Sequence, residues 1–176
     1  MALFYKVLKK TVLTLLVIIV IGYLLPYKVS SPVAPEKILK IDPESFWYYP
    51  WGETGVHKGI DIFCEPNSEV LAPVSGIVLQ TGYGTISGYY LYMLGPGWRL
   101  YYFAHLDTVT VSGGHFLSRT EVIGRAGNTG NAVNKPIHLH FSIQTIFPYP
   151  WRYDRDIEGW KKMFYLDPLK EVYFDK

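Results

Sequence analysis

Two histidines stand two residues apart in the stretch IHLHF, which runs from Ile137 to Phe141. Side chains alternate between the two faces of a β-strand, so His138 and His140 are predicted to share one face while Leu139 points to the other. Imidazole is a common metal ligand and a common general base near neutral pH. The pair therefore indicates a cleft with a metal or a proton-transfer group, although a strand with two polar residues on one face also fits so short a pattern.

Groups of the same chemical type occur in two other segments. His57 and Asp61 lie four residues apart in VHKGIDI, where a glycine-containing turn runs into an apolar strand, and His105 ends the apolar run YYFAHLD. Taken singly, the first pair could be a surface salt bridge and His105 an ordinary residue at the rim of the core. Together with the H-x-H pair they supply three ligands for a zinc ion and further histidines for proton transfer. The fifth histidine, His115 in SGGHF, is predicted to be solvated.

Other sequence features narrow the class of site. Cys64 is the only cysteine, so an internal disulfide and a cysteine-based zinc site are both excluded, and a small buried side chain is expected there. The glycine-rich stretch GYGTISG, residues 82–88, lacks the lysine and hydroxyl residue of a phosphate-binding loop and is predicted to be a hairpin turn. Any metal must therefore be held by histidine and carboxylate.

Short apolar runs separated by glycine-rich turns dominate the chain after about residue 46. Their length and their β-branched and aromatic content predict strands. The runs are GIDIF, EVLAPVSGIVLQTG, YYLYML, RLYYFAHL and IHLHFSIQT. We therefore expect a mainly β protein, an antiparallel sandwich or barrel-like sheet, over residues 46–150. A short helix near residues 156–164 is expected within a C-terminal extension, 151–176, that packs on this domain, and the proline-rich segment 29–45 is predicted to be a linker.

The N-terminal 28 residues have the composition of a membrane anchor. The run from Thr11 to Tyr27 carries no charge over 17 residues and is flanked by Lys10 and Lys28. Lysines before the run favour a cytoplasmic N-terminus and an exported body. A cleaved signal peptide is the competing interpretation, but a small-residue cleavage site is hard to find after the run.

Charge excludes a nucleic-acid partner. The formal net charge is +2, but the four lysines that flank the apolar run account for it, and the rest of the chain has 13 basic and 15 acidic residues. No basic stripe is left to neutralise phosphates.

The ordered set VHKGIDIFCEPNSEVLAPVSGIVLQTGYG, YYFAHLD, VIGRAGNTGN and IHLHFSI resembles the lysostaphin-like (LytM-type) zinc metallopeptidases, which are peptidoglycan endopeptidases. The resemblance covers roughly residues 51–145. It implies one Zn²⁺ ion held by His57, Asp61 and His140, with His105 and His138 as the catalytic pair. In this interpretation a zinc-activated water attacks the scissile amide, His138 is the base, and His105 steadies the oxyanion.

The resemblance also implies partners and a location. The substrate would be the peptide stems of peptidoglycan, with Tyr49 and Trp51 as candidates for binding them. The N-terminal helix would hold the protein in the inner (cytoplasmic) membrane by a single pass, with the catalytic domain on the periplasmic side. Ser142 stands where the family often has glutamate.

Several alternatives stay open at this stage. The cleaved bond could belong to a D-amino-acid cross-link or to a glycine bridge, and an unidentified protein activator is not excluded. A zinc-binding regulator or scaffold without catalysis is the second interpretation. A carrier domain that passes a phosphoryl group through histidine is the third, but it leaves Asp61 and the anchor without a role.

Overall fold

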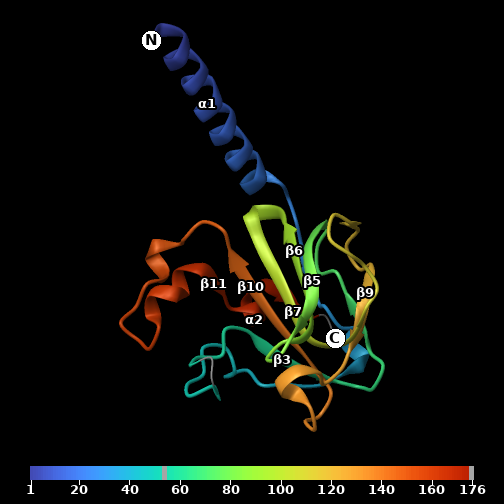
Figure 1. The fold of residues 1–176 in the computed structure, drawn as a ribbon. Coiled ribbons are helices and arrows are strands. Elements are labelled where there is room, and N and C mark those ends of the chain that lie inside the picture. The colour runs from blue at the N-terminus through green and yellow to red at the C-terminus, as the bar shows by residue number, and fades with distance from the viewer. Residues whose placement is uncertain (53–54, 175–176) are drawn as a thin grey trace.

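The computed structural model describes residues 1–52 and 55–174, and it places a long N-terminal helix beside a body of antiparallel strands (Figure 1). Ten strands of the described chain form one sheet, which confirms the mainly β prediction. They are β2 (Ile38–Ile41), β3 (Ile60–Cys64), β4 (Glu69–Leu71), β5 (Gly76–Gly84), β6 (Gly88–Gly95), β7 (Arg99–Val109), β8 (Phe116–Leu117), β9 (Val122–Ala126), β10 (His138–Thr145) and β11 (Tyr165–Leu166).

The main path of the sheet runs β2-β3-β10-β7-β6-β5-β8, with β10 and β7 at its centre. The long strand β7 pairs with β10 and β6 over its first part and with β9 over its last residues, and β9 in turn pairs with β4. β7 is thus the point at which the sheet branches. This arrangement brings β3, β10, β7 and β6 side by side to form one wall (Figure 1).

Strict alternation of side chains builds the core beneath that wall. On β10, Leu139, Phe141 and Ile143 are fully buried. They pack with equivalent residues of neighbouring strands, including Ile62 of β3 and Phe103 of β7, in one hydrophobic cluster. The residues between them on β10 are the polar ones, so burying the apolar half presents the other half on the opposite face.

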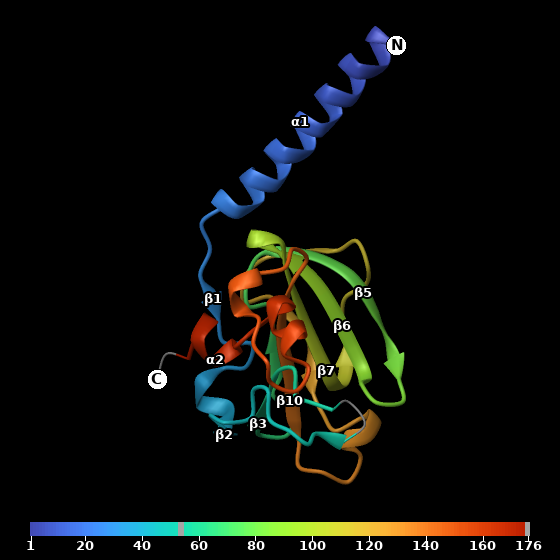
Figure 2. The same ribbon diagram turned by 90° about the vertical axis from the view of Figure 1, so that its left-hand side faces the viewer.

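The N-terminal helix α1 (Ala2–Leu24) projects from one end of the body (Figure 2). Its residues Leu3–Leu24 have a mean hydropathy of 2.1, and none of the most apolar stretch is buried against the rest of the protein. At about 1.5 Å per residue, 22 residues span roughly 33 Å, which matches the hydrocarbon thickness of a bilayer. The helix is therefore long and apolar enough to cross a membrane, and its start precedes the uncharged run.

Residues 29–45 are more than the linker that their prolines suggest. They contribute β1 (Val29–Ser30), a 3₁₀ turn η1 (Pro35–Lys37) and β2, which pairs with β3. Val29 and Val33 are 3% and 0% exposed. Because these apolar residues are part of the hydrophobic core, the segment packs against the domain over its length.

The C-terminal extension also packs on the sheet. It contains the 3₁₀ segments η5 (Pro150–Arg152) and η6 (Gly159–Phe164), then β11, the one-turn helix α2 (Pro168–Glu171) and β12 (Val172–Tyr173). β11 pairs with β10, and β12 pairs in parallel with β1. The helix expected near 156–164 is thus a 3₁₀ helix, and the short α-helix follows it.

Candidate active site

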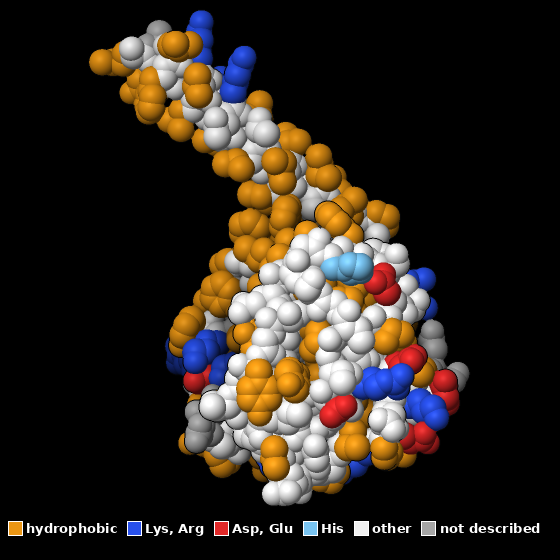
Figure 3. Space-filling view, turned by 45° about the vertical axis from the view of Figure 1, so that its right-hand side comes forward, with side chains coloured by type: hydrophobic (Ala, Val, Ile, Leu, Met, Phe, Trp, Pro, Cys, Tyr) orange, Lys and Arg blue, Asp and Glu red, His pale blue; other side chains and the backbone are white. Residues whose placement is uncertain are grey.

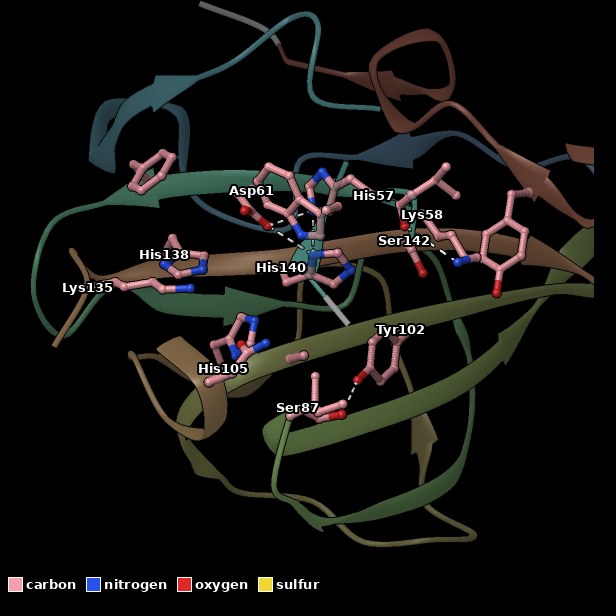
Figure 4. Close-up of a pocket in the computed structure, with 18 of the residues that line it drawn as sticks. His57, Lys58, Asp61, Ser87, Tyr102, His105, Lys135, His138, His140 and Ser142 are labelled. Atoms are coloured by element: carbon pink, nitrogen blue, oxygen red, sulfur yellow. Dashed lines mark hydrogen bonds and ion pairs between the residues drawn. The ribbon is translucent and has the colours of Figure 1, made fainter. Parts of the chain in front are cut away.

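Three predicted metal-binding side chains converge where β3 and β10 lie side by side. Asp61 of β3 is the register partner of His140 of β10, and His57 reaches the same point from the turn before β3. His57 Nε2 lies 3.1 Å from Asp61 Oδ1 and 3.0 Å from His140 Nδ1, and the last two atoms are 2.9 Å apart. The strand pairing and the turn thus bring residues 83 positions apart to one point (Figure 4).

Gly59 makes this convergence sterically possible. A Cβ at this position would lie 2.5 Å from the carbonyl oxygen of Phe141 and 3.0 Å from the His140 ring. Any residue with a side chain at position 59 would therefore push β3 away from β10. The glycine of HKGID is explained by close approach of the two strands.

His105 reaches the same cleft through an irregularity in β7. Along β7, Tyr102 and Ala104 face the cleft and Phe103 faces the core, so regular alternation would point residue 105 inward. The pairing with β6 shifts register between Tyr89 and Leu91, and His105 itself has φ of 62°. This bulge, with a left-handed histidine in it, turns the His105 ring back into the cleft.

Backbone carbonyls set the tautomers of three of these histidines. A carbonyl only accepts, so the Nδ1–H of His57 donates to Ser45 O at 2.9 Å and that of His105 donates to Thr129 O at 2.9 Å. The Nδ1–H of His138 donates to Pro136 O at 2.8 Å. In the neutral ring the other nitrogen, Nε2, is then an acceptor. All three rings therefore present an unprotonated Nε2 for ligation or for proton uptake.

Electrostatics favour an ionised aspartate and neutral histidines. Burial pushes the pKa of Asp61 upward, but the close contacts with the His140 and His57 rings outweigh it and hold that pKa well below its usual range. Burial, with the neighbouring His140, lowers the pKa of His105 to about 4. The pKa of His140 is also lowered, mainly by burial. At neutral pH the site thus offers the carboxylate of Asp61 and the unprotonated imidazoles of His105 and His140, and ionised carboxylate and neutral imidazole are the forms that bind a metal.

All five chemical groups line one cavity of about 710 Å³. His105 and His138 lie beside the cluster of three, with ring centroids 5.0 Å apart and that of His105 6.0 Å from His140. The cavity floor is polar and aromatic: Ser142, Gln144 and Tyr102 extend it away from the histidines. The other lining side chains labelled in Figure 4 are Lys58, Ser87 and Lys135.

The two residues proposed to bind substrate have different positions. Trp51 lines the cavity and stacks on His57, with ring centroids 4.1 Å apart. Tyr49, although only two residues away, is 53% exposed and is not among the described residues that line the cavity. Trp51 therefore forms part of the cavity wall, whereas Tyr49 lies outside the cavity, exposed on the surface.

Two positioning groups were not predicted from sequence. The side chain of Thr129, in the GNTGN turn, donates to Leu106 O at 2.7 Å and accepts from Tyr89 N–H at 3.0 Å, and its carbonyl holds His105. Ser45 holds His57 through its carbonyl. The threonine could have been noticed as a hydroxyl residue between glycines, but a backbone carbonyl leaves no signal in sequence.

The geometry of the cluster fits a small divalent cation. Three acceptor-capable atoms on His57, Asp61 and His140, two of them imidazole nitrogens and one a carboxylate oxygen, lie within 4.8 Å of one another. Tetrahedral ligands about 2.1 Å from zinc would lie roughly 3.4 Å apart, close to the spacing of these atoms. Two imidazoles and a carboxylate are a usual ligand set for catalytic zinc, which keeps a fourth position for water.

Comparison with known proteins shows that residues 55–150, more than half of the chain, match peptidase family M23. The peptidoglycan DD-endopeptidase ShyC of Vibrio cholerae is 24% identical over 99 residues, which are 56% of this chain and 23% of ShyC. A metalloprotease of Haemophilus influenzae is 28% identical over 118 residues, 66% of this chain and 23% of that protein. The chain thus spans about a quarter of the length of these curated relatives.

Solved structures share the fold. The catalytic domain of lysostaphin from Staphylococcus simulans has a TM-score of 0.58 and 23% identity, over 74% of this chain and 90% of that domain. A zinc-containing peptidase from Vibrio cholerae has a TM-score of 0.55 and 24% identity, over 66% of this chain and 36% of that one. At these identities the likeness concerns the architecture of the strands.

Proposed function

The chain belongs to peptidase family M23, as its motifs predict, and we propose that it is a membrane-anchored zinc endopeptidase that cuts peptide cross-links of bacterial peptidoglycan. One observation carries the proposal. The cavity combines a cluster of three metal-binding side chains with two further histidines, His105 and His138, whose tautomers are set by the backbone. A binding module would need the cluster but would have no use for two additional oriented bases.

The chemistry divides between the cluster and the two bases. A zinc ion held by His57, Asp61 and His140 would supply Lewis-acid chemistry, because it would lower the pKa of a coordinated water and polarise the scissile carbonyl. His138 accepts a proton at Nε2 and can then donate it to the leaving amine. Its Nδ1–H stays bonded to Pro136 O throughout, so the ring does not rotate during the transfer.

His105 adds a second oriented nitrogen on the same side. With a pKa of about 4 its ring is neutral, and its Nε2 can only accept until it gains a proton. We propose that Nε2 of His105 accepts a hydrogen bond from the attacking water and so orients it. The neutral ring has no Nε2 proton to donate to the substrate oxygen, so the part of His105 in the catalytic pair is to position the water.

Anchoring rests on α1 and the lysines around it. Lys6, Lys9 and Lys10 lie in the first half of the helix and Lys28 follows it. This asymmetry favours a cytoplasmic N-terminus, which would put the cavity on the periplasmic side of the inner membrane. A cavity on that side would face the peptide stems of peptidoglycan.

The test uses the full chain in detergent. Bound zinc is quantified, and the protein is incubated with purified cross-linked peptidoglycan while the released fragments are read by mass spectrometry. We expect one zinc per chain and a chelator-sensitive loss of cross-linked dimers, and the fragment masses decide between a D-amino-acid cross-link and a glycine bridge. Zinc binding without any cleavage would contradict the enzyme and favour a regulator of another wall hydrolase.

A further inference from the structure

The end of the domain opposite the histidines contacts the last turns of α1. The turn between β6 and β7, the 3₁₀ segment η3 (Pro96–Trp98), lies beside the end of the helix (Figure 1). Trp98 Nε1–H donates to the carbonyl of Ile19 at 2.9 Å. A Cβ on Gly22 would overlap the Trp98 indole, so the glycine opens the space that the ring fills. The helix is thus seated on the domain.

An aromatic cluster extends this contact along the domain. The Phe147 ring lies 6.3 Å from Tyr23 of α1 and 6.5 Å from Trp98, and Ile146 N–H donates to Trp98 O at 3.1 Å. Further along, Trp151 stacks on Tyr149 at 5.0 Å. We call these five domain residues the rim: Trp98, Ile146, Phe147, Tyr149 and Trp151.

Parts of the rim are open to the surroundings. Trp151 is 78% exposed and Ile146 is 43% exposed. Figure 3 shows hydrophobic side chains continuing from the helix onto the adjoining part of the domain. Tryptophan and tyrosine are enriched where hydrocarbon meets water in membranes, because their rings are apolar and their N–H or O–H needs a polar partner.

The short segment that connects α1 to β1 also makes contacts with the domain. Arg99, the first residue of β7, lies over the Tyr27 ring at 5.1 Å and pairs with Glu171 at 2.5 Å. Two residues after Tyr27, β1 begins and pairs with β12. The connection between helix and domain is therefore bound on both sides, which restricts rotation of the domain about the end of α1.

We propose that the rim is a membrane-docking surface that lies in the interfacial zone of the bilayer and holds the domain in one orientation. The inference rests on the proposed function in one respect, that α1 spans the membrane. The apolar helix ends at Leu24, and its last turns touch the rim, so the rim lies at the depth where hydrocarbon gives way to headgroups.

Docking fixes the height of the cavity above the membrane. β7 and β10 both run from the rim to the site: Arg99 pairs with Thr145 at the rim end, and Ala104 pairs with His140 at the site. The six steps of strand from Arg99 to His105 span about 20 Å at roughly 3.3 Å per residue. The docked domain therefore acts on peptides held about 20 Å from the membrane surface.

The test places a fluorescent reporter at the rim. In a Cys64→Ala background, which removes the one native thiol, an environment-sensitive label is attached at Ile146→Cys. The matched control carries the same label at Val133→Cys, an exposed residue in the loop just before β10, at the site end. Full chains are reconstituted into nanodiscs of phosphatidylethanolamine and phosphatidylglycerol, with and without lipid spin-labelled near the headgroup.

We expect the label at position 146 to emit at shorter wavelength and to lose most of its emission to spin-labelled lipid, while the label at 133 does neither. Adding Trp98→Ala should weaken quenching at 146, and Trp98→Phe should largely preserve it. If the chain stays in the nanodisc but label 146 behaves like label 133, docking is wrong and the anchor stands. If the chain leaves the nanodisc, anchor and docking both fail, while peptidoglycan cleavage in detergent still tests the enzyme.

Discussion

The two ends of the central strands β7 and β10 are built on opposite plans. At the site end, three of the imidazole rings are tied to backbone carbonyls: His57 to Ser45, His105 to Thr129 and His138 to Pro136. At the rim end, partly buried aromatic rings contact one another and the helix, and Trp151 is largely exposed. The same strands thus connect a region that needs directional bonds with one that needs only apolar area.

Both ends use left-handed backbone to aim a large ring. His105 has φ of 62° in the bulge of β7, and Trp98 has φ of 55° in the turn before that strand. A bulky residue adopts this region rarely and at a cost of about 1–2 kcal/mol. At the site the strain directs an imidazole into the cavity, whereas at the rim it directs an indole toward α1. Substitutions should therefore alter chemistry at one end and placement or stability at the other.

The largest expected effect is loss of the metal. His140→Ala removes one of three ligand atoms that lie within 4.8 Å of one another, so bound zinc and turnover should both disappear. Metal analysis of the purified full chain, paired with the peptidoglycan assay, measures both. A variant that kept one zinc per chain would show that the proposed ligand set is wrong.

His138→Ala should separate chemistry from metal binding. The ring is not part of the cluster of three, so zinc content should stay at one per chain. Removing a positioned base typically costs 10²- to 10⁴-fold, and we expect turnover to fall by about 10³-fold. Zinc analysis and initial cleavage rates check the two halves. Wild-type turnover in this variant would remove His138 from the mechanism.

Thr129→Val tests how the site end holds His105. The substitution keeps the shape but leaves Leu106 O and Tyr89 N–H without their partner, at a cost of about 1–3 kcal/mol in the free energy of unfolding. Because the same turn carries the carbonyl that orients His105, we expect turnover to fall about tenfold with zinc retained. Thr129→Ser keeps the hydroxyl and is the matched control. Equal activity of the two variants would mean that the hydroxyl does not position His105.

Sequence patterns predicted the parts of the molecule that depend on alternation. The alternation in IHLHFSI predicts that Leu139 faces away from the two histidines, and Leu139 is fully buried in the core. The shared face of His138 and His140 follows from the same rule, and both line the cavity. The spacing of residues within one strand is a local property, so the face on which each side chain lies can be predicted from the sequence alone.

Features that depend on contacts between distant segments could not be read in this way. The bulge that turns His105 into the cavity arises from the pairing of β7 with β6, and YYFAHLD contains no residue that requires left-handed backbone. Prolines suggested a linker at 29–45, yet Val29 and Val33 are buried against strands far along the chain. Neighbouring prolines restrict the backbone without preventing such side chains from joining a core.

The smallest expected effect lies near the rim, and it sharpens the contrast with the site. Glu171→Gln weakens the ion pair between Glu171 and Arg99, and should lower the free energy of unfolding by about 1 kcal/mol. The Glu171 side chain is 27% exposed and that of Arg99 is 12% exposed. Glu65→Gln removes the pair between Glu65 and Lys37, whose side chains are both nearly half exposed, and should leave the free energy of unfolding unchanged within the error of the measurement.

Denaturant unfolding of the full chain in one detergent compares the two variants with wild type, and zinc content and cleavage rate are measured on the same samples. Both should keep wild-type zinc and turnover, because neither pair touches the cavity. A loss of turnover in Glu171→Gln at unchanged zinc would mean that the two ends of β7 are coupled. A change at Arg99 would then reach His105 along the strand, and the functional separation of the site end from the rim end would be wrong.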